Sequence, residues 1–297
     1  LAIEFDGNRS RTFANATMDK GLFSSDLYAK ADGQGALDYQ MTNATKALDA
    51  MTGAQAADRE GDRVGALVAA EMSGGNLSTR QRANAGINAT VHQITNATLA
   101  TSGSALTYGV NREGDRGNTS VTGTMDSGYF NNTMGVVSED KNVSIYHKSD
   151  SSRALTGTSD ALAADESGNL AQTTVRTTQT GGLFDTVMGL EADGSASIYQ
   201  KTNATLTTSG QTFTRGLSQE GDRANTSVTG TMNSGYFNNT MSVVSEDENV
   251  SIYHKSDFTK SLTGSSSALA KDDVGTLAQT SVHTTQTGGL FDTMMGL

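Results

Sequence analysis

The sequence predicts an all-β fold made of tandem antiparallel β-meander repeats, and three observations support this prediction. Markers recur along the chain with a period of about 53.5 residues, which indicates a repeat architecture. The 297 residues contain no Pro, and Pro is excluded from central strands because it lacks the N–H that a ladder needs. Apolar and polar residues alternate with the period of two that is typical of a half-buried strand. We therefore expect one long sheet or an array of β-arches.

The long repeat is visible as near-identical segments that lie 107 residues apart. Residues 113–125 return at 220–232, and residues 177–186 return at 284–293. A weaker repeat has half this period, because a glycine followed by apolar residues recurs every 53 or 54 positions. These glycines are Gly21, Gly75, Gly128, Gly182, Gly235 and Gly289.

This grid predicts that residues 1–297 form a single repeat array with partial units at both ends. The predicted units are 1–20 (partial), 21–74, 75–127, 128–181, 182–234, 235–288 and 289–297 (partial).

Each unit contains strand-like segments separated by turn chemistry. Thr119, Val121 and Met125 fall on one face of such a segment, and the polar residues between them fall on the other. The following 126–128, Asp-Ser-Gly, favours a turn. We therefore expect three or four antiparallel strands in each unit. An odd number would reverse the chain direction at every unit, which would explain why copies 107 residues apart are the most alike.

The bulk composition argues against several classes of function. The formal net charge is -11, so the protein should repel phosphate backbones, and we expect no nucleic-acid partner. There is no Cys, which excludes disulfides and thiol chemistry. No apolar run reaches the roughly 18 residues of a transmembrane helix. Because the chain begins at Leu1 rather than Met, we expect a secreted, extracellular product whose signal peptide has been removed.

Asparagine is concentrated in N-glycosylation sequons, which indicates N-linked glycans as partners of a surface protein. Of the 19 Asn residues, 13 begin an Asn-x-Ser/Thr sequence. In the strand that holds Val121, Asn118 falls on the polar face. The candidate glycosylation sites are Asn8, Asn15, Asn43, Asn76, Asn88, Asn96, Asn118, Asn131, Asn142, Asn203, Asn225, Asn238 and Asn249.

No constellation of residues points to catalysis, a cofactor or a metal, so we expect a protein that is not an enzyme. The four His residues show no metal-ligand spacing. The Asp-Arg pairs at 62–63, 115–116 and 222–223 are interpreted as turn salt bridges. Acidic turns at 139–140, 191–194 and 246–248 leave calcium as an alternative, although each supplies only two or three of the roughly 6–8 oxygen ligands that Ca²⁺ takes.

Both ends of the chain have strand-like patterns, and open strand edges invite addition of further strands. The ~53-residue Thr/Asn-rich units, the missing Cys and Pro, the acidic charge and the sequons together resemble the major sheath proteins of filamentous methanogenic archaea, and more broadly archaeal surface-layer and filament proteins. The resemblance implies a structural subunit that polymerises with itself into amyloid-like extracellular hoops. The alternative is a six-bladed β-propeller-like binding module, since six glycine corners recur at this spacing.

Overall fold

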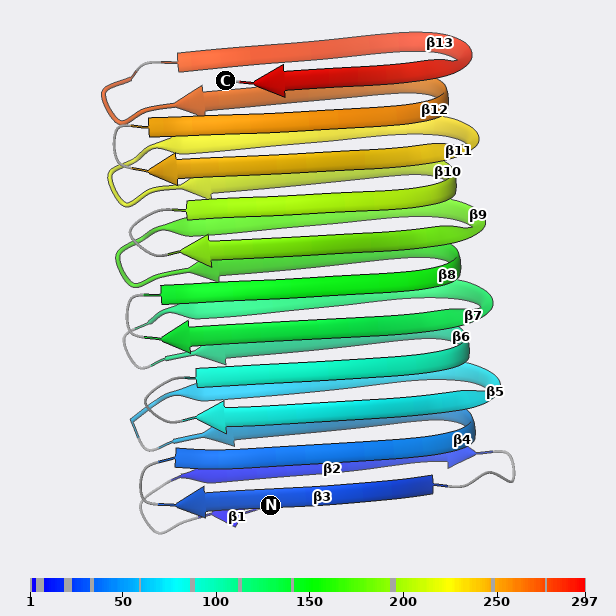
Figure 1. The fold of residues 1–297 in the computed structure, drawn as a ribbon, viewed down its shortest axis with the longest axis vertical. Helices are drawn as coiled ribbons and strands as arrows, with labels where there is room; N and C mark the ends of the chain where they lie inside the picture. Colours follow the sequence, from blue (N-terminus) through cyan, green and yellow to red (C-terminus); the bar gives the residue numbers. More distant parts are fainter. Residues whose placement is uncertain are drawn as a thin grey trace.

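The computed structural model describes residues 2–3, 8–18, 23–32, 35–58, 60–85, 89–111, 114–139, 142–192, 196–246, 249–275 and 277–296. Within these residues the fold is a single antiparallel sheet of 13 strands, in which consecutive long strands pair with each other (Figure 1). The expected all-β repeat array is confirmed. The strands are β1 (Ala2–Ile3), β2 (Arg9–Met18), β3 (Phe23–Asp32), β4 (Gly35–Ala57), β5 (Arg63–Ala85), β6 (Ala89–Val110), β7 (Arg116–Glu139), β8 (Asn142–Ala164), β9 (Leu170–Ala192), β10 (Ala196–Leu217), β11 (Arg223–Glu246), β12 (Asn249–Lys271) and β13 (Leu277–Gly296).

Each repeat of 53 or 54 residues is one hairpin of two long strands, and not three or four strands as expected. Residues 126–128 do not end a strand, because β7 runs through them and bends there. The chain direction is therefore restored in every unit, and the explanation of the 107-residue period by an odd strand number is wrong. We call β5, β7, β9, β11 and β13 the odd strands, and β4, β6, β8, β10 and β12 the even strands.

Every long strand bends near its middle, so the sheet folds over on itself into two layers with the bends along one side (Figure 1). We call each bend an arch. From β8 to β13 each arch has one residue in the left-handed region, with φ between 50° and 110°. In β9 and β13 this residue is glycine, which adopts this conformation without steric cost. These arch residues are Arg153, Gly181, Leu206, Ser234, Lys260 and Gly288.

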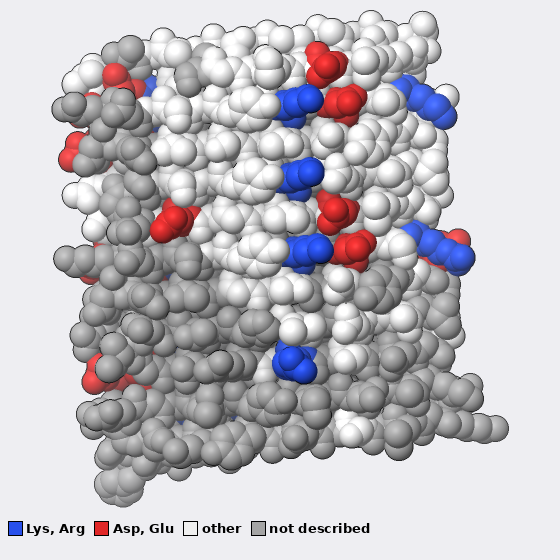
Figure 2. All heavy atoms as spheres, in the orientation of Figure 1, with Lys and Arg blue, Asp and Glu red and all other residues white. Residues whose placement is uncertain are grey.

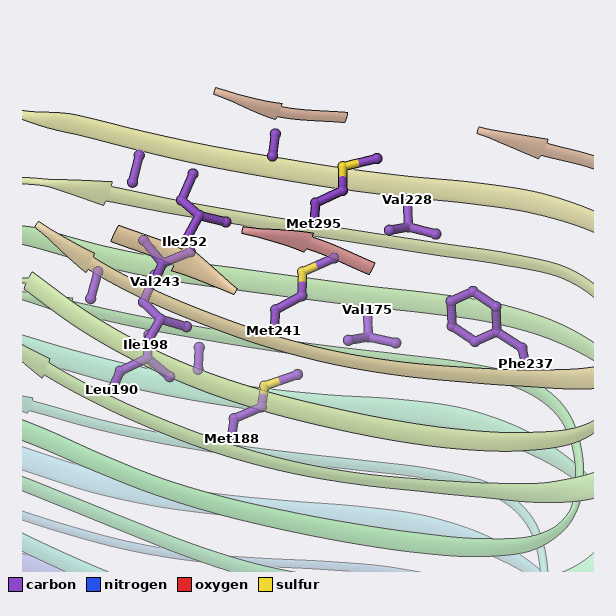
Figure 3. Close-up of a cluster of buried hydrophobic side chains, with 14 of the residues drawn as sticks. Val175, Met188, Leu190, Ile198, Val228, Phe237, Met241, Val243, Ile252 and Met295 are labelled. Atoms are coloured by element: carbon purple, nitrogen blue, oxygen red, sulfur yellow. The ribbon is translucent and has the colours of Figure 1, made fainter. Parts of the chain in front are cut away.

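The core lies between the two layers and consists of rows that run across the strands in register. Leu190, Ile198, Val243 and Ile252 form one such row on β9 to β12 (Figure 3). All four are buried. Since neighbouring strands in a sheet are about 4.7–4.9 Å apart, such rows place similar side chains in continuous contact along the array. The repeat of the sequence is therefore also the repeat of the core.

Aromatic rings in one layer fit against glycines in the other. Phe237 stacks on Phe258 with ring centroids 4.9 Å apart, and Phe258 stacks on Phe291 at 5.1 Å. A Cβ atom on Gly230 would lie 2.6 Å from the Phe258 ring, and one on Gly264 would lie 2.6 Å from the Phe291 ring. Each ring thus takes the space that a side chain would need on the preceding strand, and this fit fixes how the two layers lie against each other.

The outer surface of the array also carries rows of like residues. Lys148, Lys201 and Lys255 share one register position on β8, β10 and β12 and are exposed. Figure 2 shows that basic and acidic side chains gather in neighbouring rows on the face it presents. An in-register sheet thus turns each sequence repeat into a stripe of one chemistry along the array.

Candidate assembly interface

The last strand, β13, is a long sheet edge with little protection against further pairing. It pairs with β12 on one side, and in the described part of the chain no strand covers its other side. Its 20 residues contain no Pro, Lys or Arg, the residues that natural proteins use to block edge pairing. An open strand of this length can take up another strand through its free N–H and C=O groups.

A comparison with β9 shows how β13 differs from a covered strand of nearly the same sequence. The side chains of β9 alternate between buried and more exposed, whereas those of β13 are mostly exposed. Leu183 of β9 is 38% exposed, and Leu290 at the same repeat position in β13 is 62% exposed. Because the sequences match, the difference comes from the strand β10 that covers β9.

At the arch, side-chain hydrogen bonds connect an odd strand to the next even strand. Gln179 of β9 donates from Nε2 to the carbonyl oxygen of Thr205 in β10, at 3.1 Å. The backbone N–H of Leu183 donates to the Thr205 hydroxyl at 2.8 Å. In the next pair the N–H of Tyr236 donates to the Thr259 hydroxyl at 2.9 Å. These bonds satisfy the backbone where the arch interrupts the ladder.

A second set of contacts connects neighbouring hairpin turns and was not predicted from the sequence. Asp115 accepts from the backbone N–H of Glu166 at 2.7 Å, and Asp222 accepts from that of Asp273 at 2.8 Å. The Oδ1 atom of Asn169 accepts from the N–H of Gln219 at 2.9 Å. Each of these bonds joins one turn to the next turn along the array. We call this chain of bonds the turn relay.

The turn relay gives two aspartates of the Asp-Arg pairs a role that the interpretation as salt bridges did not include. Asp115 is fully buried, and its Oδ2 accepts a hydrogen bond from Asn111 Nδ2 at 2.7 Å. Arg116 is exposed, because successive residues of a strand point to opposite faces. Asp222 and Arg223 show the same division into a buried and an exposed residue. The repeated Gly-Asp pattern was the signal that could have indicated a turn motif.

The structure places the sequon asparagines in different environments. Asn15, Asn96 and Asn118 are exposed, and Asn118 lies opposite the buried Val121 and Met125, as expected. Asn8 is only 1% exposed and lies at the turn position that Asp62 and Asp115 occupy in later units, so its amide is not accessible to a glycan. Four other asparagines are half-buried, namely Asn131, Asn203, Asn225 and Asn238. The side chains of Asn43, Asn76, Asn88, Asn142 and Asn249 lie outside the described residues.

Several of these asparagines lie directly opposite one another on adjacent strands. Asn96 pairs with Asn131, and Asn203 pairs with Asn238. The Cβ atoms of such cross-strand partners are about 4.5–5.5 Å apart, which leaves no room for two glycans. Tyr236 also donates to the Asn203 side-chain oxygen at 3.0 Å. At most one member of each pair can therefore carry a glycan.

Among the described residues, no group of three or more His, Asp or Glu side chains lies close enough to hold a metal ion. His254 is fully buried, and its neighbours Thr226, Ser256 and Ser266 all offer hydroxyl groups to the ring. The expected acidic turns fall partly on residues 140, 193–194 and 247–248, which lie outside the described residues.

No helix long and apolar enough to cross a membrane is found in the part of the chain that the structure describes. The chain matches no family model, no curated protein and no solved structure. The repeat geometry is therefore the basis for any statement about function.

Proposed function

We propose that this protein is a structural subunit that polymerises through its sheet edges into an extracellular sheath, hoop or filament. The observation that supports this most is β13, an open strand that repeats the sequence of a strand covered in the interior. A further strand added there would continue the rows of the core in the way that β10 continues them beyond β9. Repetition of such an addition, head to tail, produces rings or filaments.

The extracellular location and the kinship with archaeal sheath proteins are part of the same proposal. They are supported by the repeat length, the composition and the sequons. Exposed Asn15, Asn96 and Asn118 are the proposed sites of N-linked glycans. Glycopeptide mass spectrometry of the native material checks this, and unmodified peptides at all three positions would contradict it.

The proposal is tested by negative-stain electron microscopy of the purified chain, before and after treatment with detergent. We expect hoops, tubes or filaments that persist in detergent, because continuous ladders and buried rows resist solvation. Discrete particles of 30.9 kDa that stay monodisperse at high concentration would contradict polymerisation and would favour the propeller-like binding module instead.

A further inference from the structure

The interior arches contain a steric feature that recurs in three odd strands. Gly128, Gly182 and Gly235 each lie under a carbonyl group of the following even strand. A Cβ atom at these positions would lie 2.1, 2.0 and 1.9 Å from the carbonyl oxygens of Ser152, Thr205 and Thr259, respectively. Such separations are far inside van der Waals contact. Glycine is therefore required at an arch wherever an even strand follows.

β13 has the same arch residues, without the carbonyl that lies over them in the interior. The three atoms nearest to a Cβ atom on Gly289 would all belong to the Gln286 side chain, at 3.5 Å, so no backbone carbonyl lies as close as in the interior arches. The Nε2 atom of Gln286 is buried and has no hydrogen-bond partner, whereas the equivalent Nε2 of Gln179 donates to the carbonyl oxygens of Leu183 in its own strand and of Thr205 in β10. A buried donor without a partner is destabilising, so a carbonyl oxygen that lies here and accepts from Gln286 Nε2 would stabilise the bound strand.

We infer that the arch of β13 is a socket that accepts the bend of an even-type strand in a single register. The socket consists of Gln286, Gly289 and Leu290, and the inference rests on the proposed edge addition. The occupant is a polypeptide strand, antiparallel to β13, whose bend contains an Asn-x-Thr sequence like residues 203–205. The carbonyl of its Thr lies over Gly289 and accepts from Gln286, and its Thr hydroxyl accepts from the Leu290 N–H.

The charge of Asp292 in β13 determines which residue is favoured at the first position of the Asn-x-Thr sequence in the incoming strand. Asp292 lies directly opposite Asp257 of β12, so one side of its carboxylate already faces a like charge. In the interior, Asp185 likewise faces Asp150 on one side and faces the neutral Asn203 on the other. Like charges directly opposite on adjacent strands are destabilising. The socket therefore prefers a strand with Asn at this position, such as β10, over one with Asp, such as β12.

The test uses the full chain and a labelled synthetic peptide of residues 196–217, with binding measured by fluorescence anisotropy at concentrations below self-assembly. We expect Gly289→Ala to bind the peptide at least about tenfold more weakly, because the new methyl group occupies the place of the incoming carbonyl. The matched control is Gly296→Ala in the same strand. The interior equivalent of Gly296 is Gly189, which has strands on both sides. A Cβ atom on Gly189 would have no atom within 4 Å, so Gly296→Ala should bind the peptide as tightly as the wild type. Equal binding by the two variants would overturn the inference.

Two further measurements keep the outcome clear. Gln286→Leu should weaken binding too, and circular dichroism should show that all three variants keep the β-sheet of the wild type. Because the chain has no Cys, Asp292→Cys and a peptide with Asn203→Cys test the register, since Asp185 and Asn203 are direct partners. A crosslink formed equally well by a peptide with Cys at position 201 would contradict a single register.

The outcomes separate this inference from the proposed function. If the wild-type chain and Gly289→Ala both assemble equally well without peptide, polymerisation is supported and the socket is contradicted. Chain that never assembles but binds the peptide in a Gly289-dependent manner would support the socket and contradict self-polymerisation.

Discussion

His254 lies between Met241 and Met295 in a row across the interior, where a polar ring is unexpected. Burial lowers its pKa from 6.5 to about 4, because desolvation disfavours the charged imidazolium. The neutral ring is held by hydroxyl groups, with Thr226 Oγ1 at 3.0 Å and Ser256 Oγ at 2.5 Å. Gln200, also flanked by methionines, occupies the equivalent place in β10, so the row requires a neutral hydrogen-bonding side chain.

We predict that His254 makes the protein less stable as the pH falls from about 6.5 to 4. In this window the unfolded chain binds a proton at His254 and the folded chain does not, so protonation favours the unfolded state. The shift from 6.5 to about 4 corresponds to a loss of up to about 3 kcal/mol. Urea unfolding at pH 7 and pH 4.5 measures it. His254→Gln should remove most of this pH dependence, and a variant that keeps the full dependence would contradict the assignment.

At the scale of residues, the direction of side chains was predictable, but their hydrogen-bond roles were not. The alternation of Asn118, Thr119 and Val121 identified the buried face, and the structure confirms it. Asn8 forms a sequon by its sequence, yet it is buried at a turn position. The local sequence did not reveal this role, because a turn asparagine acts partly through distant residues: Asn169, at the equivalent position, accepts from Gln219, 50 residues away.

At the scale of elements, the turn relay makes a prediction about hairpin stability. Asp222→Ala leaves the Asp273 N–H without its acceptor and removes the bond from Ser218 Oγ at 3.2 Å. We expect a loss of about 0.5–1.5 kcal/mol in the free energy of unfolding, the net contribution of a typical hydrogen bond, because Asp273 is exposed and water can replace the lost acceptor. Denaturant unfolding measures this loss, and hydrogen exchange at Asp273 should accelerate.

The matched control for this prediction is Asp222→Asn. The asparagine keeps the Oδ1 acceptor, and Asn169 already fills the same role in the preceding turn, where it accepts from Gln219. Asp222→Asn should therefore stay close to wild type. If the Asn variant were as destabilised as the Ala variant, the charge of Asp222 and not its acceptor would be the important property.

The number of strands in a unit could not be predicted, because the local sequence does not distinguish a hairpin turn from an arch. The Asp-Ser-Gly sequence at 126–128 favours a turn, and the chain does bend there. A hairpin returns the chain within one layer, whereas an arch carries it into the other layer, and both need the same local flexibility. The arch creates contacts across the two layers, such as the Phe258 ring of β12 against Gly230 of β11. These contacts join residues in different strands, so the local sequence does not reveal them.

At the scale of the whole molecule, each long strand contacts chiefly its neighbours in the sheet. The stability of such an array is approximately a sum of strand terms and neighbour terms. The buried rows of Met, Phe and Ile do not converge on one central cluster, since the same contacts repeat from β9 to β13. The repeat in the sequence predicted this extended architecture as either one long sheet or an array of β-arches, and the structure shows one sheet whose strands bend into arches.

This organisation predicts that the array can lose its last strand without unfolding. A chain that ends at residue 276 lacks β13 and the stacking of Phe291 on Phe258, but β9 and β10 keep both of their neighbours. Hydrogen exchange should show unchanged protection in β9 and β10 and lower protection in β12 alone. Thr212→Pro within β10 is the contrasting variant, because Pro removes a ladder N–H from a central strand and should lower protection in β9 and β11 as well. If the shorter chain lost protection throughout, the fold would depend on global closure rather than on neighbour contacts, and addition of strands at a free edge would lose its physical basis.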